Sequence, residues 1–398
     1  MALLMVLFAL PVGITFYKFV TQTMKTSMQE KRQKTAAEIA NDVIMDYMRQ
    51  FSQSPSGDHY ALDTLERPQT FYSSGFSTVT VIPDSINRTV YLKAQGSYGT
   101  QSKPLARKTL EALIQFASDI TQYGTMLNGP FTISASNVTY DGGLWFNGNL
   151  KVTGSNVRFR GGPLVVNGNV TAPASAVLDG DLYYSGGSAG NLTVLGMKYN
   201  FTPPTSWPVL DFNYYDAHYT YKTTSNRTVI FNSTGTFTVV GVGMYPIPAA
   251  GAIIYGENCN LTIRGIVSGR VTAVAYGAIG SGTQGNITVN DNLYYAGASS
   301  IAASAQCSFA AMARNSIAFS KTGADLLVAG VYFVEQGTSN MSMTGSTGRI
   351  FRLYGVRTQG ISVSGFTGGR ELHYDANLRS FPPPGLPERA LLVNWKLH

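Results

Sequence analysis

The chain has 398 residues, of which 44% are apolar and only 13% are charged, with 42 glycines, 23 tyrosines and 20 phenylalanines. The charged share is about half the usual one, which favours a β-rich extracellular protein over a cytosolic enzyme. The formal net charge is +7. The densest basic cluster, Lys31, Arg32 and Lys34, follows an apolar N-terminal stretch, as juxtamembrane residues do, and we expect no nucleic-acid partner.

The N-terminal segment is apolar and uncharged over residues 1–17. Nothing basic precedes this run, unlike in a secretory signal peptide, and the run is short for a membrane-spanning helix. From Ala36 to Phe51 apolar residues recur at spacings of three and four, which is typical of an amphipathic helix. We expect one helical rod of about 80 Å over residues 1–53, broken only near Pro11 and Gly13.

A small collar is predicted over residues 54–127. Two alternating segments, 76–82 and 88–94, flank the turn sequence PDSIN and predict a β-hairpin. Residues 105–123 place apolar side chains on one helical face, so we expect a second helix there.

The remaining region, residues 128–398, has short apolar strands separated by Gly and Asn. The segments that begin at Leu144, Leu164 and Leu182 are 20 and then 18 residues apart. A period near 20 residues indicates a β-solenoid, in which stacked coils complete each other's core. The pattern lapses over 199–248, where we expect an excursion with its own hairpin. The predicted fold class is therefore α+β, mostly β, with a long N-terminal helix, the collar and a β-helix domain.

The end of the chain carries a distinctive motif after the solenoid. It consists of Tyr374, Asp375, Leu378, Pro382 to Gly385, Pro387 and Trp395. Together with the apolar tail, the long helix and the solenoid, this motif resembles large pilin-like proteins whose N-termini are similar to minor pilins of type IV pilus systems. The resemblance covers nearly the whole chain.

The resemblance implies export, removal of a leader by a prepilin peptidase, and residence in the inner membrane before assembly. Met1 is then the mature, N-methylated terminus. The residues implied for a filament core are Met1, Ala2, Leu3, Leu4, Met5, Val6, Leu7, Phe8, Leu10, Pro11, Gly13, Ile14, Phe16 and Tyr17. Pilins usually carry Glu at the fifth mature position, paired with a neighbour's amine, whereas this chain has Met5, which leaves open whether the subunit is major or minor.

Residues suited to catalysis or metal binding are sparse. The four histidines, His59, His218, His373 and His398, are far apart and match no metal-binding spacing. Asp179 and Asp181 lie two residues apart, a pattern that suits either a sugar-cleaving carboxylate pair or the capping of solenoid turns. We expect no catalytic residues, no metal site and no cofactor.

Two kinds of residue suggest modification in an exported protein. Glycosylation sequons occur at Asn87, Asn137, Asn169, Asn191, Asn200, Asn226, Asn232, Asn260, Asn286 and Asn340. An Asn- and Thr-rich β protein also produces such tripeptides by chance. Cys259 and Cys307 either form a disulfide or are two small buried residues.

The sequence thus predicts a structural subunit of an extracellular type IV pilus-like filament, a helical homopolymer that displays its β-helical domain for surface contact or adhesion. Its expected partners are further copies of itself, the pilus assembly machinery of the inner membrane and surface glycans. Two alternatives stay open at this point: a low-copy minor or tip adhesin, and a membrane-anchored β-helix enzyme that acts on polysaccharides.

Overall fold

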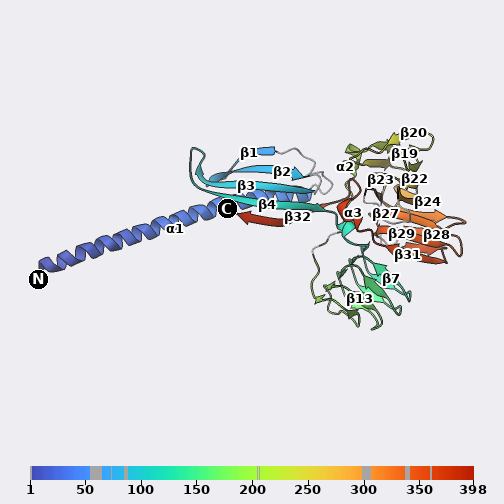
Figure 1. Cartoon of the computed structure of the whole chain (residues 1–398), viewed down its shortest axis with the longest axis horizontal. Helices are drawn as coiled ribbons and strands as arrows, with labels where there is room; N and C mark the ends of the chain where they lie inside the picture. The colour runs from blue at the N-terminus through green and yellow to red at the C-terminus, as the bar shows by residue number, and fades with distance from the viewer. Residues whose placement is uncertain are drawn as a thin grey trace. The chain divides into compact units, whose positions relative to one another are not determined.

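A computed structural model describes residues 2–53, 65–72, 74–84, 88–203, 205, 207–297, 306–336, 341–358 and 361–398. The protein is 49% strand and 15% helix, which confirms the α+β, mostly β class. The chain divides into two compact units. Unit 1 comprises Met1–Ala117 and Arg389–His398, and unit 2 comprises Ser118–Glu388; many of the elements are labelled in Figure 1.

The N-terminal helix α1 runs without interruption over Ala2–Gln53. Its end at Gln53 agrees with the predicted range of residues 1–53. The break predicted near Pro11 and Gly13 is wrong, because helical backbone continues through both residues. Proline removes one backbone hydrogen bond from a helix, but a helix of this length stays continuous despite that local loss.

Unit 1 contains a five-stranded antiparallel sheet in the order β1-β2-β3-β4-β32. The predicted hairpin is present as β2 and β3, which pair from Gly75↔Tyr98 to Asp84↔Thr89. The strands are β1 (Leu65–Tyr72), β2 (Gly75–Asp84), β3 (Thr89–Thr100), β4 (Lys103–Ala117) and β32 (Arg389–Leu397).

The second helix predicted over residues 105–123 is wrong, because most of this segment forms strand β4, followed by the single 3-10 turn η2 (Asp119–Gln122). Leu110, Ala112, Ile114 and Phe116 are all buried, at a spacing of two. The same segment also fits a helical spacing, so its period is ambiguous. Pairing with β3 along its length and with β32 on its other edge decides for the strand.

The C-terminal half of α1 packs on this sheet. Ala40, Val43, Ile44 and Phe51 form one core with residues of β2, β3 and β4. The helix backbone passes very close to β3, because a Cβ added to Gly96 would lie 2.0 Å from the carbonyl oxygen of Ala36. A glycine is therefore required at the crossing point.

Unit 2 begins with a small parallel stack, which confirms the predicted solenoid repeat. Leu144, Leu164 and Leu182 occupy the same register position in successive coils. Three strands make most coils, so the stack has three faces. The first face contains β5 (Thr125–Leu127), β8 (Leu144–Phe146), β11 (Leu164–Val166), β14 (Leu182–Tyr184) and β16 (Lys198–Tyr199). The second contains β6 (Phe131–Ile133), β9 (Leu150–Val152) and β12 (Val170–Thr171), and the third β7 (Thr139–Asp141), β10 (Arg158–Arg160), β13 (Val177–Asp179) and β15 (Thr193–Val194).

A larger parallel stack follows. One face contains β17 (Tyr221–Thr223), β21 (Ala252–Glu257), β23 (Arg270–Tyr276), β25 (Ser308–Ala313), β27 (Leu326–Val334) and β29 (Ile350–Arg357). Another contains β18 (Arg227–Asn232), β22 (Leu261–Val267), β24 (Asn286–Tyr295), β26 (Ser316–Lys321), β28 (Met341–Gly345) and β30 (Ile361–Ser364), and β31 (Gly369–His373) pairs with β29. The expected excursion does contain a hairpin, β18 with β19 (Thr236–Val239), extended by β20 (Gly243–Pro246), but β18 also stacks on β22.

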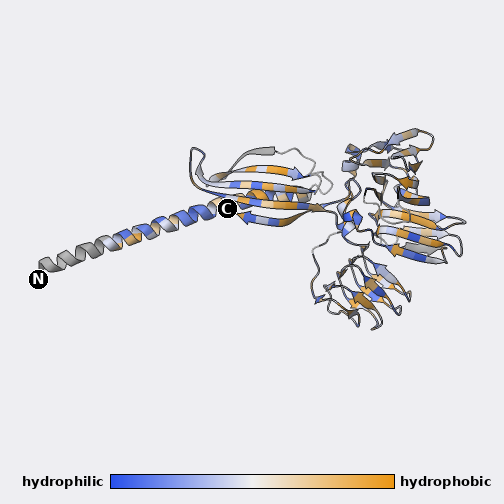
Figure 2. Ribbon diagram, in the orientation of Figure 1, coloured by the Kyte–Doolittle hydropathy of each residue, from blue (hydrophilic) through white to orange (hydrophobic). Residues whose placement is uncertain are grey.

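The two stacks share one sheet, because Thr125 of β5 pairs in parallel with Arg357 of β29. Alternate residues of this sheet enter different cores, as strands require. In β21, Ala252 and Ile254 face the interior of the larger stack, whereas Ile253 and Tyr255 face a second core on the opposite side. Figure 2 shows hydrophobic and hydrophilic residues interspersed along the strands in both stacks.

The division of the chain differs from the three predicted regions. The segment predicted as a separate collar, residues 54–127, is divided between the units: the part up to Ala117 belongs to unit 1, where its strands share a core with α1, and the part from Ser118 belongs to unit 2. The terminal strand, predicted to end the solenoid domain, belongs to unit 1, where Arg389 pairs with Ala117. Unit 2 is thus an insertion between two neighbouring strands of unit 1.

The contact at Gly96 gives a test of the helix–sheet packing. We expect Gly96→Ala to destabilise unit 1 by about 1–3 kcal/mol, because backbone atoms of α1 must move to admit the methyl group. Urea unfolding followed by far-ultraviolet circular dichroism, which reports mainly on α1, measures the loss. Gly187→Ala is the matched control, since a Cβ there meets no atom within 4 Å. Equal stability of the two variants would contradict the close crossing.

Candidate assembly interface

The N-terminal half of α1 exposes a set of large apolar side chains. Phe16, Tyr17, Phe19 and Met24 are 68%, 72%, 69% and 65% exposed. This half of the helix projects beyond the sheet of unit 1 (Figure 1). Exposed apolar side chains gathered in this way, rather than scattered singly, mark an interaction surface.

Four threonine hydroxyls on α1 are satisfied within the helix. Thr21, Thr23, Thr26 and Thr35 each donate to the carbonyl oxygen four residues earlier, at 2.6, 2.9, 3.0 and 3.1 Å. A hydroxyl bonded in this way needs no partner outside its own helix. The threonines can therefore enter an apolar interface without leaving an unsatisfied donor.

The implied filament-core residues fall into two groups. Phe16 and Tyr17 lie on the exposed half of α1. Met1 lies outside the described residues. The backbone of Ala2, Leu3, Leu4, Met5, Val6, Leu7, Phe8, Leu10, Pro11, Gly13 and Ile14 is helical, and their side chains lie outside the description. Within the described part of the chain, no helix combines the length and the apolar character needed to cross a membrane.

The edge strand β32 adds a second exposed apolar set in unit 1. Leu392, Trp395 and Leu397 are 41%, 61% and 45% exposed. They pair with Ile114, Ala112 and Leu110 respectively, which are buried under α1, so all three point to the helix-covered face of the sheet. Sequence reasoning treated Trp395 only as part of the terminal motif and did not assign it to a surface.

The rest of the terminal motif, within residues 374–387, packs on unit 2, and this segment is called the strap below. Tyr215 Oη donates to Gly385 O at 2.8 Å, and Arg270 Nε donates to Pro382 O at 3.0 Å. Leu378 and Leu386 are buried in the outer core of the shared sheet. The proline-rich residues therefore cover that sheet instead of forming an exposed binding motif.

Asp375 is the buried charge of this strap. Its carboxylate accepts a hydrogen bond from Asn377 N at 3.0 Å, where the short helix α3 (Asn377–Ser380) begins. Only 3% of Asp375 is exposed. Burial raises the pKa of its carboxyl group, and the hydrogen bonds from Asn377 offset this only partly.

The residues weighed for catalysis do not come together. Asp181 Oδ1 accepts from Met197 N at 2.8 Å and so caps a turn, whereas Asp179 is exposed at the end of β13. A spacing of two residues places side chains on one face of a continuous strand, but β13 ends at Asp179 and Gly180 follows with φ +154°, so the two aspartates do not share a strand. No group of three or more His, Cys, Asp or Glu side chains within the described ranges is arranged to hold a metal ion.

The histidines make separate contacts. His218 stacks on Tyr214, His398 Nε2 lies 3.3 Å from Glu111 Oε2, and His373 Nδ1 lies 3.5 Å from Asp141 Oδ2. His59 lies outside the described residues.

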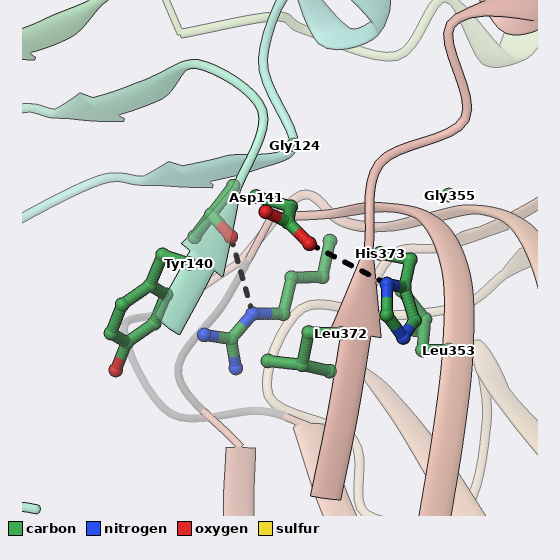
Figure 3. A pocket seen from close by; sticks show the side chains of 9 residues that line it. Gly124, Tyr140, Asp141, Leu353, Gly355, Leu372 and His373 are labelled. Carbon is green, nitrogen blue, oxygen red and sulfur yellow. Dashed lines mark hydrogen bonds and ion pairs between the residues drawn. The ribbon is translucent and has the colours of Figure 1, made fainter. Parts of the chain in front are cut away.

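A small hollow lies where the two stacks of unit 2 meet (Figure 3). Asp141 and Tyr140 come from β7, and His373 comes from β31. Arg357 is buried beside them and donates from Nε to Thr125 Oγ1 at 3.4 Å. The hollow has room for about one water molecule, which is too little for a sugar ring.

Several sequon asparagines form ladders between coils. Asn226 Oδ1 accepts from Asn260 N at 2.8 Å, Asn260 Oδ1 accepts from Asn286 N at 3.1 Å, and Asn286 Oδ1 accepts from Ser316 Oγ at 2.6 Å. Asn137, Asn169, Asn191, Asn200 and Asn226 are exposed, Asn232, Asn260 and Asn286 are partly buried, and Asn87 and Asn340 lie outside the described residues. Glycosylation stays a prediction, best suited to the exposed set.

Of the two alternatives for the cysteines, the structure has the second: both are buried and both thiols are free. Cys259 follows the end of β21, and Cys307 precedes the start of β25. These strands lie in register in one sheet, so the cysteines are separated by about 20 Å of strand, beyond the reach of a disulfide. Burial raises the pKa of Cys259 to about 11.

Comparisons with known proteins find a likeness among solved structures. No protein-family model matches the chain, and no curated protein matches it. Among solved structures, the chain is similar to the competence-associated pilin ComZ from Thermus thermophilus, with 10% identity and a TM-score of 0.42. The match covers 92% of this chain and 97% of that one. At this identity and TM-score, the likeness assigns neither a fold nor a function to the present chain.

The buried Asp375 gives a pH-dependent prediction. Because its folded pKa is raised, its contribution to stability is fully present below the unfolded pKa and is lost as the pH rises through the folded pKa. We expect Asp375→Asn, which keeps an acceptor for Asn377 N, to gain stability relative to the wild type on going from pH 4 to pH 7. Urea midpoints of the two proteins at both pH values measure this. If the difference in urea midpoint between wild type and variant is the same at both pH values, folding does not raise the pKa of Asp375.

Proposed function

We propose that this chain is a structural subunit of an extracellular type IV pilus-like filament. The observation that carries the proposal is the two-part character of α1. Its C-terminal half is buried against the sheet, and its N-terminal half exposes Phe16, Tyr17 and Phe19 together. A helix whose exposed half is this apolar is stabilised when copies of it pack side by side.

The apolar sequence that precedes residue 17 extends the same helix and supports the proposal. It lengthens the surface available for helix–helix contact by several turns. The exposed row on β32 adds apolar area on unit 1 for contact between copies. In this proposal unit 2, whose stacked coils satisfy one another's backbone hydrogen bonds, is displayed to the surroundings for surface contact or adhesion. The inner membrane before assembly and the pilus machinery belong to the proposal as the expected route.

A charge on the exposed half of α1 tests the role of this helix. We expect Phe16→Glu combined with Phe19→Glu to reduce the number of surface filaments at least about tenfold, because an unpaired carboxylate inside an apolar bundle is costly. Electron microscopy of the producing cells counts the filaments. Met45→Glu is the control, since Met45 is 55% exposed on the packed half of the same helix. Normal filaments in the double variant would refute assembly through this surface.

A low-copy subunit at the filament tip is the second candidate, and Met5 favours it in the register that the resemblance to pilins implies. A copy without the usual Glu lacks the partner for a neighbour's terminal amine. Immunogold labelling separates the two roles: a polymer former is labelled along the whole shaft, and a tip subunit only at the end. Labelling confined to the tip would replace the homopolymer proposal with this one.

We propose no catalytic role. Asp181 is engaged in a turn hydrogen bond, which favours the capping alternative over a carboxylate pair. We expect no turnover of acidic polysaccharides by the wild type in a reducing-sugar and unsaturated-product assay. Activity that disappears in Asp179→Asn combined with Asp181→Asn would establish the polysaccharide enzyme instead.

A further inference from the structure

A corner of the larger stack brings an amine, an amide and a carboxylate together. Strand β24 pairs with β26 up to Val289 and with β27 at Leu293, so residues 290–292 form the corner between two faces. In the next coil, the same corner follows Lys321, the last residue of β26. Asp291 and Asn292 therefore lie beside Lys321 of the adjacent coil.

The contacts at this corner are close. Lys321 Nζ lies 2.8 Å from Asn292 Oδ1 and 2.8 Å from Asp291 Oδ1. Leu327 N also donates to Asn292 Oδ1, at 3.1 Å. Only 16% of the Lys321 side chain is exposed, so the amine is held against the amide by its surroundings.

This arrangement contains the elements of an acyl transfer. Leu327 N donates to the amide oxygen of Asn292, where it polarises the carbonyl group and stabilises the negative charge of a tetrahedral intermediate. Lys321 Nζ lies 2.8 Å from the oxygen of this amide, which gives the proximity that such reactions need. Asp291 is placed to accept a proton from Lys321 and to pass it on.

We propose that Lys321 and Asn292 form an intramolecular isopeptide bond. Asp291 takes a proton from the Lys321 ammonium group, and the neutral amine attacks Cγ of Asn292. The Nζ–Cγ bond forms, and Asp291 returns the first proton to Nδ2 as the Cγ–Nδ2 bond breaks. The attacking nitrogen loses its second proton to the departing ammonia, which leaves as ammonium. No oxidant or cofactor is required, since an amide and an alkylammonium group give a new amide and ammonium.

Charge at the corner sets the rate of this reaction. The hydrogen bond from Lys321 holds the pKa of Asp291 below its usual range, with smaller contributions from Asn292 N and from the charge of Arg264. A carboxylate with a lowered pKa is a weak proton acceptor, so the bond forms slowly, and it accumulates because the loss of ammonia is irreversible.

The bond would join two consecutive coils covalently. It closes a loop between Asn292 and Lys321 and so restricts the unfolded chain, as a disulfide does. It resists separation of the coils in the direction in which they stack, because it adds a covalent link to the hydrogen bonds and side-chain packing between them.

Peptide mapping of the purified full-length protein, after incubation at pH 8, tests the proposal. Trypsin cuts after Arg270, Arg314, Lys321 and Arg349 in the unlinked chain. The bond blocks cleavage at Lys321 and yields a branched peptide that joins 271–314 to 315–349 and is lighter by one ammonia. Mapping is preferred to intact mass, because succinimides at Asn147-Gly148 or Asn167-Gly168 lose the same mass. Quantitative recovery of a free 315–321 peptide would overturn the proposal.

Two variants assign the roles. Lys321→Arg keeps a cation but has no amine, and Asp291→Asn keeps both partners but has no proton acceptor. We expect no branched peptide in the first, at least a tenfold slower appearance in the second, and a lower unfolding temperature for both than for the linked wild type. Branched peptide forming in Asp291→Asn at the wild-type rate would exclude the mechanism.

Discussion

In-register stacking of parallel coils is the constraint on which unit 2 depends. A three-residue strand such as Leu144–Phe146 cannot bury its side chains alone, and only the coil above and the coil below complete its surroundings. Because the same register continues from β17 through β29 to β5 and β16, two segments far apart in the sequence share one sheet. Each coil is therefore stable only as part of the whole stack.

Stacking also decides what the polar residues do. Asn226, Asn260 and Asn286 repeat at one position in successive coils. The side-chain oxygens of the first two each accept a hydrogen bond from the backbone N of the asparagine in the next coil. The corner of Asp291 and Asn292 meets Lys321 for the same reason, since equal positions of neighbouring coils lie one strand spacing apart. Part of the sequon pattern in the sequence is thus a structural ladder between coils.

Unit 1 follows a different rule, because its core lies between one helix and one antiparallel sheet. The sheet buries only the half of α1 that begins near Ala36, and the close passage at Gly96 sets the distance between helix and strand. The other half of α1 has no sheet beneath it, so Phe16, Tyr17 and Phe19 are exposed. The same helix can serve as a core element at one end and as an assembly surface at the other.

The sequence by itself determined the elements that depend on the residue pattern within the element. The period of α1 and the 20-residue spacing of Leu144 and Leu164 predicted the helix, the solenoid and the overall α+β class, because each repeat carries its own signal. Only the tertiary structure decided elements whose partners are distant. The apolar spacing of residues 103–117 fits both a helix and a strand, and pairing with β3 and β32 decides for the strand. The terminal strand joins unit 1 because Arg389 pairs with Ala117. Likewise Cys259 and Cys307 stay apart while Lys321 meets Asn292, because the positions of coils in the stack, and not distance along the chain, set which side chains touch.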